Sequence, residues 1–150
     1  MSGIVCAIRG GPASKPTIDR SISLSKETGQ PIYFLYIVNL DFLTHASSSH
    51  LHTITEDMRQ MGEFILLSAQ STAAASGAAA EGVIRDGEVA EEINNLCHEI
   101  DADYLVVGQP QTHEKEKTVF SQDRMDTFIQ KVEQEAGVKV IIADGNQNAE

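Results

Sequence analysis

The chain has 150 residues, of which 41% are hydrophobic and 22% are charged, which is enough for one domain spanning residues 1–150 and too little for two. The formal net charge of -11 and the isoelectric point near 4.8 argue against binding to DNA, RNA or anionic membranes, because such surfaces need clustered Lys and Arg. The acidity fits either good solubility or a high-salt habitat, and the sequence does not separate the two. Neither a leader sequence nor an apolar stretch of about 20 residues is visible, so we expect a cytoplasmic protein.

Short apolar runs rich in Val and Ile recur along the chain. Four are clear, at residues 4–8, 32–38, 104–107 and 138–143, and a weaker fifth lies at residues 83–85. None alternates strictly with polar residues, which is typical of strands buried on both faces of a sheet. The runs therefore predict five buried strands.

Helical patterns lie between these runs. The first has Ser14 as its N-cap, Pro16 in its first turn and Gly29 at its end, and the second opens with Thr53 and Glu56 at capping-box spacing. The inward stripe of the second is predicted to be Met58, Met61, Ile65 and Ala69. The third repeats Val89, Ile93, Leu96, Cys97 and Ile100, and the fourth repeats Met125, Phe128, Ile129 and Val132.

The alternation of strands and helices predicts an α/β fold, a doubly wound three-layer sandwich with a five-stranded parallel sheet and helices on both faces. Two polar segments, residues 39–52 and 109–122, interrupt the alternation and are predicted to be loops. Residues 144–150 are expected to form a flexible tail. Ligands of open parallel sheets bind beyond the carboxyl ends of the strands, where the connections diverge, so any site is expected there.

Signals for metal binding or catalysis are weak. His45, His50 and His52 share one predicted loop, but their spacing fits no standard zinc pattern, so we interpret this segment as a surface connection. The alternating charges at residues 114–117 allow a lid over a bound anion or an ordinary solvated loop, and we favour the loop. No nucleophile elbow, Walker loop or dinucleotide fingerprint occurs, so an enzyme is not expected. Cys6 and Cys97 are predicted to be buried, reduced thiols.

Several stretches of the chain resemble the universal stress protein family. Residues 4–11 are similar to its first strand, which ends in Asp-Gly-Ser, and residues 86–93 and 101–108 are similar to its third helix and fourth strand. Residues 126–143 match its carboxyl end without a gap. The resemblance covers nearly the whole chain and implies the fold called adenine nucleotide alpha hydrolase-like.

The resemblance implies a nucleotide site whose phosphate loop is altered here. In ATP-binding members the loop reads Gly, two residues, Gly, nine residues, then Gly followed by Ser or Thr. Gly108 matches the first position and Gln111 replaces the second Gly. The loop that follows is longer than the family spacing, and Asp126 and Thr127 then replace the final pair. Glycines let backbone amides approach a triphosphate, whereas a carboxylate beside it repels it. We therefore expect no cofactor, with ATP or AMP as the candidates if a nucleotide binds.

The same resemblance supplies the candidate ligand-binding residues. They are Ile8, Arg9, Gly10, Val38, Val107, Gly108, Arg124 and Thr127. Arg9 stands where the family has an acidic residue near the nucleoside. Its guanidinium either holds an anionic ligand or pairs with Asp126 or Asp41, and we favour the pairing.

The last strand is expected at a sheet edge, and family members commonly dimerise through it, so the resemblance implies a homodimer that uses Val138, Val140 and Ile142. The leading hypothesis is a dimeric regulatory or interaction module of stress adaptation, with an unidentified protein partner, that does not bind ATP tightly. The alternative is a sensor of AMP, ATP or another anion that uses Arg9, Arg124 and Thr127 in a variant phosphate loop. A nucleotide hydrolase ranks last.

Overall fold

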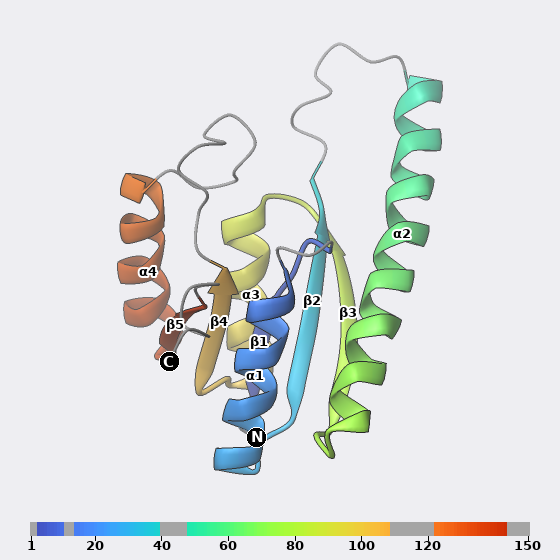
Figure 1. The fold of residues 1–150 in the computed structure, drawn as a ribbon. Coiled ribbons are helices and arrows are strands. Elements are labelled where there is room, and N and C mark those ends of the chain that lie inside the picture. The colour runs from blue at the N-terminus through green and yellow to red at the C-terminus, as the bar shows by residue number, and fades with distance from the viewer. Residues whose placement is uncertain (1–2, 11–13, 40–47, 109–121, 144–150) are drawn as a thin grey trace.

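The computed structural model describes residues 3–10, 14–39, 48–108 and 122–143, and for residues 48–51 and 122–125 it describes the backbone alone. Five parallel strands form one sheet in the order β3-β2-β1-β4-β5 (Figure 1). The strands are β1 (Ile4–Ala7), β2 (Ile32–Val38), β3 (Ala80–Asp86), β4 (Tyr104–Gly108) and β5 (Lys139–Ala143). The predicted fold class is confirmed, and the weak fifth strand candidate is a full edge strand. The predicted tail lies outside the described residues.

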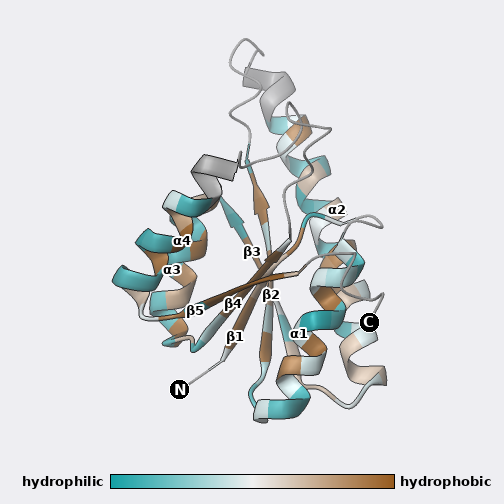
Figure 2. Cartoon of the chain, turned by 60° about the vertical axis from the view of Figure 1, so that its left-hand side comes forward, coloured by the Kyte–Doolittle hydropathy of each residue, from teal (hydrophilic) through white to brown (hydrophobic). Residues whose placement is uncertain are grey.

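Two helices cover each face of the sheet. They are α1 (Lys15–Thr28), α2 (Ser48–Ala75), α3 (Val89–Ile100) and α4 (Gln122–Ala136). The first two share one buried cluster, which contains Ile4, Phe34 and Leu66, and the other two share a second cluster, which contains Leu105 and Ile93. The central strands are mostly apolar between these layers (Figure 2), as the apolar runs of the sequence predict.

The first helix begins and ends where the sequence predicts. Ser14 occupies the N-cap position, Pro16 lies in the first turn, and Gly29 ends the helix with a left-handed φ of 76°. Only the function of Ser14 differs from the prediction, because its hydroxyl makes no capping bond to α1. The third helix is capped through the side chain of Glu88, which accepts a hydrogen bond from the Glu91 amide.

The second helix differs from its prediction at its start and in its orientation. It begins at Ser48, so residues 48–52, predicted to be loop, are helical. The segment contains Ser and His but no Gly or Pro, and extending an existing helix through such residues costs little. Met61, predicted to face the core, is 58% exposed. Gly62 faces the sheet instead, where a Cβ atom would overlap the ring of Tyr36, and this orientation carries Met61 to the outside.

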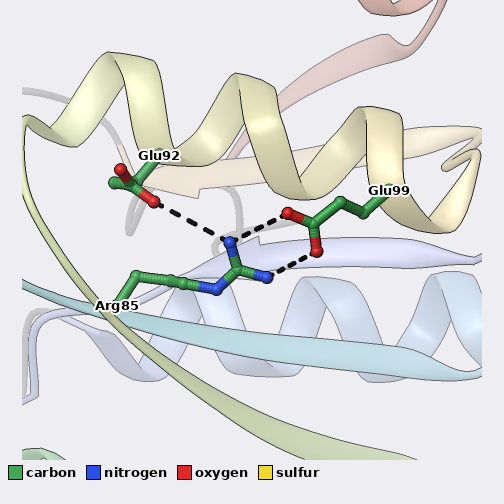
Figure 3. Close-up of polar contacts among 3 residues, drawn as sticks. All are labelled: Arg85, Glu92 and Glu99. Atoms are coloured by element: carbon green, nitrogen blue, oxygen red, sulfur yellow. Dashed lines mark hydrogen bonds and ion pairs between the residues drawn. The ribbon is translucent and has the colours of Figure 1, made fainter.

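The edge strand β3 is tied to the helices on both faces by two consecutive side chains. The guanidinium of Arg85 donates to both carboxylate oxygens of Glu99 on α3, at 2.6 and 3.0 Å, and lies 3.8 Å from a carboxylate oxygen of Glu92 (Figure 3). Asp86 accepts a hydrogen bond of 2.6 Å from Arg59 on α2. Alternate residues of a strand point to opposite faces, so neighbouring residues of β3 reach the two helical layers.

The two cysteines are free and buried, as predicted, and each belongs to a different face of the sheet. Burial raises the pKa of both Cys6 and Cys97 to about 12, because the charged thiolate is poorly solvated inside the protein. Within the described residues, none of the helices is long and apolar enough to span a bilayer.

Candidate functional site

The best candidate site lies beyond the carboxyl ends of β1 and β4. These strands are neighbours at the centre of the sheet, yet the chain leaves β1 toward α1 on one face and leaves β4 toward α4 on the other. A crevice is expected where connections diverge in this way. The structure therefore places the predicted residues Ile8, Arg9, Gly10 and Gly108 at the switch point of the sheet.

In the described part of the turn after β1, Ser14 pairs with the backbone of Arg9 and Gly10. The hydroxyl oxygen of Ser14 accepts hydrogen bonds from the amides of Arg9, at 3.3 Å, and Gly10, at 3.0 Å. The same hydroxyl lies 3.2 Å from the Gly10 carbonyl oxygen, to which it donates. The hydroxyl of Ser14, at the start of the first helix, therefore engages these two amides, which are then not available to an anion in the crevice.

Gly10 is required at this turn for two reasons. Its φ is 87°, in the left-handed region that side chains rarely adopt, and a Cβ atom would lie 2.5 Å from the terminal methyl group of Ile65 on α2. The Ile65 side chain therefore packs directly over the turn. No local pattern indicates this contact, because it joins residues 55 positions apart that share no motif.

Arg9 lies just beyond the end of β1, at the rim of the expected crevice, and its side chain is exposed. It is near Tyr36 on β2: burial raises the pKa of the Tyr36 hydroxyl, and the Arg9 charge acts in the opposite direction to a smaller extent. Of the two acidic partners predicted for Arg9, Asp41 lies outside the described residues. The predicted pairing of Arg9 with either acid stays a prediction.

The end of β4 is used for packing. A Cβ atom on Gly108 would come within 3.1 Å of the Thr17 hydroxyl on α1, so the glycine permits close approach of that helix. The predicted residues Ile8, Val38 and Val107 are buried, the first two beneath α1 and α2 and the third beneath α3 and α4. The structure thus divides these apolar candidates between the two faces of the sheet.

The fourth helix contains the residues that replace the final Gly-Ser pair. It begins at Gln122, so Asp126 and Thr127 are its fifth and sixth residues, and both side chains are exposed. Only the first four amides of a helix lack an intrahelical acceptor, so the amides of these two residues are engaged within the helix. Arg124 belongs to the same first turns, but its side chain lies outside the described part of the chain, as does Gln111.

The histidines do not form a described metal site. His45 lies outside the described residues, His50 is described by its backbone alone, and His52 is exposed on α2. Among the residues with described side chains, no group of three or more metal-ligating side chains lies close together.

Sequence comparison identifies the family. The sequence model of the universal stress protein family matches residues 1–142. The chain belongs to this family. No curated protein sequence matches it significantly.

Solved universal stress proteins share the fold over nearly their whole length. The protein UspA from Lactobacillus plantarum is 14% identical, with a TM-score of 0.75 and coverage of 95% of this chain and 97% of that one. An Archaeoglobus fulgidus member in complex with dAMP is 17% identical, with a TM-score of 0.60 and coverage of 95% and 98%. An Arabidopsis thaliana member with AMP bound is 15% identical, with a TM-score of 0.60 and coverage of 99% and 95%. At these identities the likeness shows the fold alone.

In this universal stress protein, Ser14, Ile65 and Thr17 lie against the described strand ends at the switch point. Sequence reasoning found the strand ends and the altered loop residues. It missed Ser14 as the acceptor for two turn amides, Ile65 as the cover of Gly10, and Thr17 as the neighbour of Gly108. For these three contacts, the one local signal in the sequence was Ser14, which follows the turn glycine Gly10 by four residues.

Proposed function

We propose that this protein acts in stress adaptation as a dimeric regulatory module that does not hold ATP tightly. The observation that carries the proposal is the use of backbone amides at the switch point. The amides of Arg9 and Gly10 donate to Ser14, and those of Asp126 and Thr127 lie inside α4. A polyphosphate site needs amides that point outward without a protein acceptor, and these four do not supply them.

Charge supports the same proposal. Asp126 is exposed on the second turn of α4, where the resemblance to the family would place phosphate oxygens. A carboxylate there repels a triphosphate, and the net charge of -11 adds a long-range opposing field. Two independent causes therefore weaken ATP binding in this proposal: backbone amides that are already engaged, and negative charge.

Calorimetric titration with Mg-ATP tests the proposal. We expect a dissociation constant above about 1 mM, corresponding to less than about 4 kcal/mol of binding free energy. Asp126→Asn separates the two causes, since it removes the charge but leaves α4 intact, and it should not restore tight binding. Gln130→Glu, on an exposed position of the same helix, controls for an unrelated change of charge. Submillimolar affinity of the unaltered protein for ATP would contradict the proposal.

The dimer is proposed through β5. This strand is at the edge of the sheet, where one row of its backbone groups has no neighbouring strand within the described residues. Val140 and Ile142 are partly buried on one side by the second core cluster, whereas Val138 precedes the strand and is buried in that cluster. Pairing of β5 with its twofold mate would satisfy the edge. Hydrogen exchange tests this, since the outward amides of β5 should exchange more slowly as protein concentration rises.

The second candidate function is a sensor of AMP or a related anion. It is favoured by the solved relatives described as complexes with dAMP or AMP, and by the exposed guanidinium of Arg9 at the rim of the crevice. A monophosphate needs fewer amides than a triphosphate does. A thermal-shift panel of AMP, cyclic AMP and ATP, repeated with Arg9→Gln, distinguishes it: a rise in melting temperature for AMP that Arg9→Gln removes would favour the sensor.

A further inference from the structure

The outward face of α2 carries three large apolar side chains at a spacing of three residues. Met61, Phe64 and Leu67 are exposed by 58%, 72% and 64%. Taking about 200 Å² for each fully exposed side chain, they present on the order of 400 Å² of apolar surface, which is within the range of the largest patches on monomeric proteins. We call these three residues the α2 stripe. The helix forms one outer boundary of the molecule in Figure 1.

The stripe does not serve the core of its own domain. The inward face of the same helix is complete without it, with Leu66, Ala69 and Ala73 buried against β2 and β3. A helix that is apolar on both faces is normally covered on both faces. Among the described residues, none covers Met61, Phe64 and Leu67, so we consider another molecule as the cover.

We propose that the α2 stripe binds the same stripe of a second copy, with the two helices antiparallel about a twofold axis at Phe64. Residues at equal steps on either side of Phe64 then lie level with one another in the two copies. Met61 of one copy is level with Leu67 of the other, and the two Phe64 rings meet at the axis. The patch is therefore complementary to itself, as an isologous interface requires.

The distribution of charge along α2 favours antiparallel over parallel pairing of the two helices. All four charged residues of α2 that lie on its described turns precede Phe64: Glu56, Asp57, Arg59 and Glu63. Residues 64–75 contain none. Antiparallel pairing places the outward Asp57 level with Ser71 of the second copy, whereas parallel pairing would place it beside the same carboxylate. In a chain of net charge -11, a partner segment without charge avoids repulsion.

The size of the stripe sets the expected strength. A stable interface usually takes about 800 Å² from each partner, and the apolar side chains supply about half of this, with Gln60, Ser68 and Ser71 at the flanks. The association should therefore be reversible, with a dissociation constant in the micromolar range. It uses the side of the sheet formed by β2 and β3, far from the β5 edge, so it is compatible with the dimer proposed there.

Sedimentation tests whether the stripe associates. Between about 1 μM and 1 mM, the weight-average mass of the unaltered protein should rise to at least twice the limiting mass of Phe64→Glu, which places two carboxylates at the axis; the ratio exceeds two where β5 pairing and the stripe together link protomers into open chains. Gln130→Glu adds the same charge on α4 and should behave as the unaltered protein does. Because both masses are compared, the result holds whether or not β5 also forms a dimer. Equal masses for the unaltered protein and Phe64→Glu at every concentration would overturn the proposal.

Cysteine cross-linking tests the direction. Gln60→Cys and Ser68→Cys keep all three apolar residues, and the native thiols are buried. In the antiparallel pair, Cys at position 60 is level with position 68 of the second copy, but like positions are about 12 Å apart along the axis, beyond disulfide reach. A mixture of the two variants should therefore cross-link on mild oxidation, and either variant alone should not. Cross-linking of each variant with itself would reject the antiparallel pair. The absence of cross-links both in the mixture and in each variant alone would also reject it. Flotation with phosphatidylcholine vesicles without self-association would likewise reject it in favour of a lipid surface.

Discussion

The helices α2 and α3 cover opposite faces of the same sheet and are tied to the same edge strand, but they divide their apolar residues differently. On α3, Ile93, Leu96 and Cys97 are buried, and the outward positions are polar. On α2, Leu66 is buried while Phe64 and its neighbours in the stripe are exposed. The third helix thus has one task, which is to close the core. The second has two, and its buried residues lie on its inward face alone.

The difference shows that apolar periodicity alone does not identify the buried face of a helix. Both helices have enough apolar residues to cover the sheet, but α2 has more than one face can bury. The small residue Gly62 favours this orientation, because a side chain at that position would overlap the ring of Tyr36. Burial therefore follows the closest possible approach of backbone to sheet, and the bulkier Met61 is left outside.

The strongest test replaces one leucine on each helix. Leu96→Ala removes a side chain that is 2% exposed and should lower the free energy of unfolding by about 2–5 kcal/mol. Leu67→Ala removes one that is 64% exposed and should change it by less than about 1 kcal/mol, since alanine is also a good helix former. Urea unfolding at submicromolar protein, where the proposed association is negligible, measures both. Similar losses for the two variants would show that the stripe belongs to the folded core after all.

A second test concerns the inward face of α2 and the turn it covers. Gly10→Ala should lower the free energy of unfolding by about 2–4 kcal/mol. Alanine would have to adopt the left-handed backbone conformation, and its methyl group would also overlap the side chain of Ile65. Gly29→Ala is the matched control: its φ is 76°, but nothing lies within 4 Å of the added atom, so only about 1–2 kcal/mol is expected. Thermal or urea unfolding gives both values.

The double variant Gly10→Ala with Ile65→Ala isolates the steric part of that loss. If the overlap matters, the double variant should lose less than the sum of its two single variants, by an interaction energy of about 1 kcal/mol or more. Strict additivity would mean that Ile65 moves aside without cost and does not close the turn.

The sequence was sufficient for the parts of the fold that are determined by local signals. Buried strands show as uninterrupted apolar runs, and α1 is delimited by Ser14, Pro16 and Gly29, which act within one turn of where they stand. The start of α2 was placed too late because Ser and His are neither strong formers nor breakers of helices. Met61 was misassigned because a stripe of this width is compatible with several orientations of the helix.

The candidate site was predictable in position but not in its contacts. The strand ends that carry Ile8, Val38, Val107 and Gly108 follow from the order of elements and the general rule for parallel sheets. The contact of Ile65 with Gly10 depends on how far α2 approaches the sheet, which no local pattern encodes. The position of Thr127 within a helix, rather than at its first free amide, depends on where α4 begins. Such boundaries are the least reliable part of any prediction from sequence.

The buried thiols of Cys6 and Cys97 allow the cores on the two faces of the sheet to be compared at alkaline pH. Each thiol has its pKa raised from 9.0 to about 12 by burial, so the stability due to the protonated form is complete below pH 9 and is lost as the pH rises toward 12. At pH 10 each should lower the free energy of unfolding by roughly 1 to 2 kcal/mol relative to neutral pH. Cys6→Ala and Cys97→Ala should each reduce this pH dependence by a similar amount, measured by urea unfolding between pH 8 and 10. If only one variant reduced it, the core on the other face would be hydrated.

The smallest expected effect concerns the ion pairs that tie β3 to the two helices. Hydrogen bonding to Arg85 is the main cause that lowers the pKa of the Glu99 carboxyl below 4.5, so this pair stabilises the fold above that pH and the contribution is lost as the pH falls through the lowered pKa. Arg85→Gln should therefore lower the melting temperature slightly at pH 7 and leave it nearly unchanged near pH 2 to 3.

Arg59→Gln is the matched control on α2, since it removes the single bond to Asp86. Because Arg85 holds both oxygens of Glu99 and also lies near Glu92, its loss should exceed that of Arg59, and high salt should diminish the difference. Equal and salt-independent losses would mean that α2 and α3 are held to the edge strand by packing alone, and that the two-sided attachment through β3 adds nothing to it.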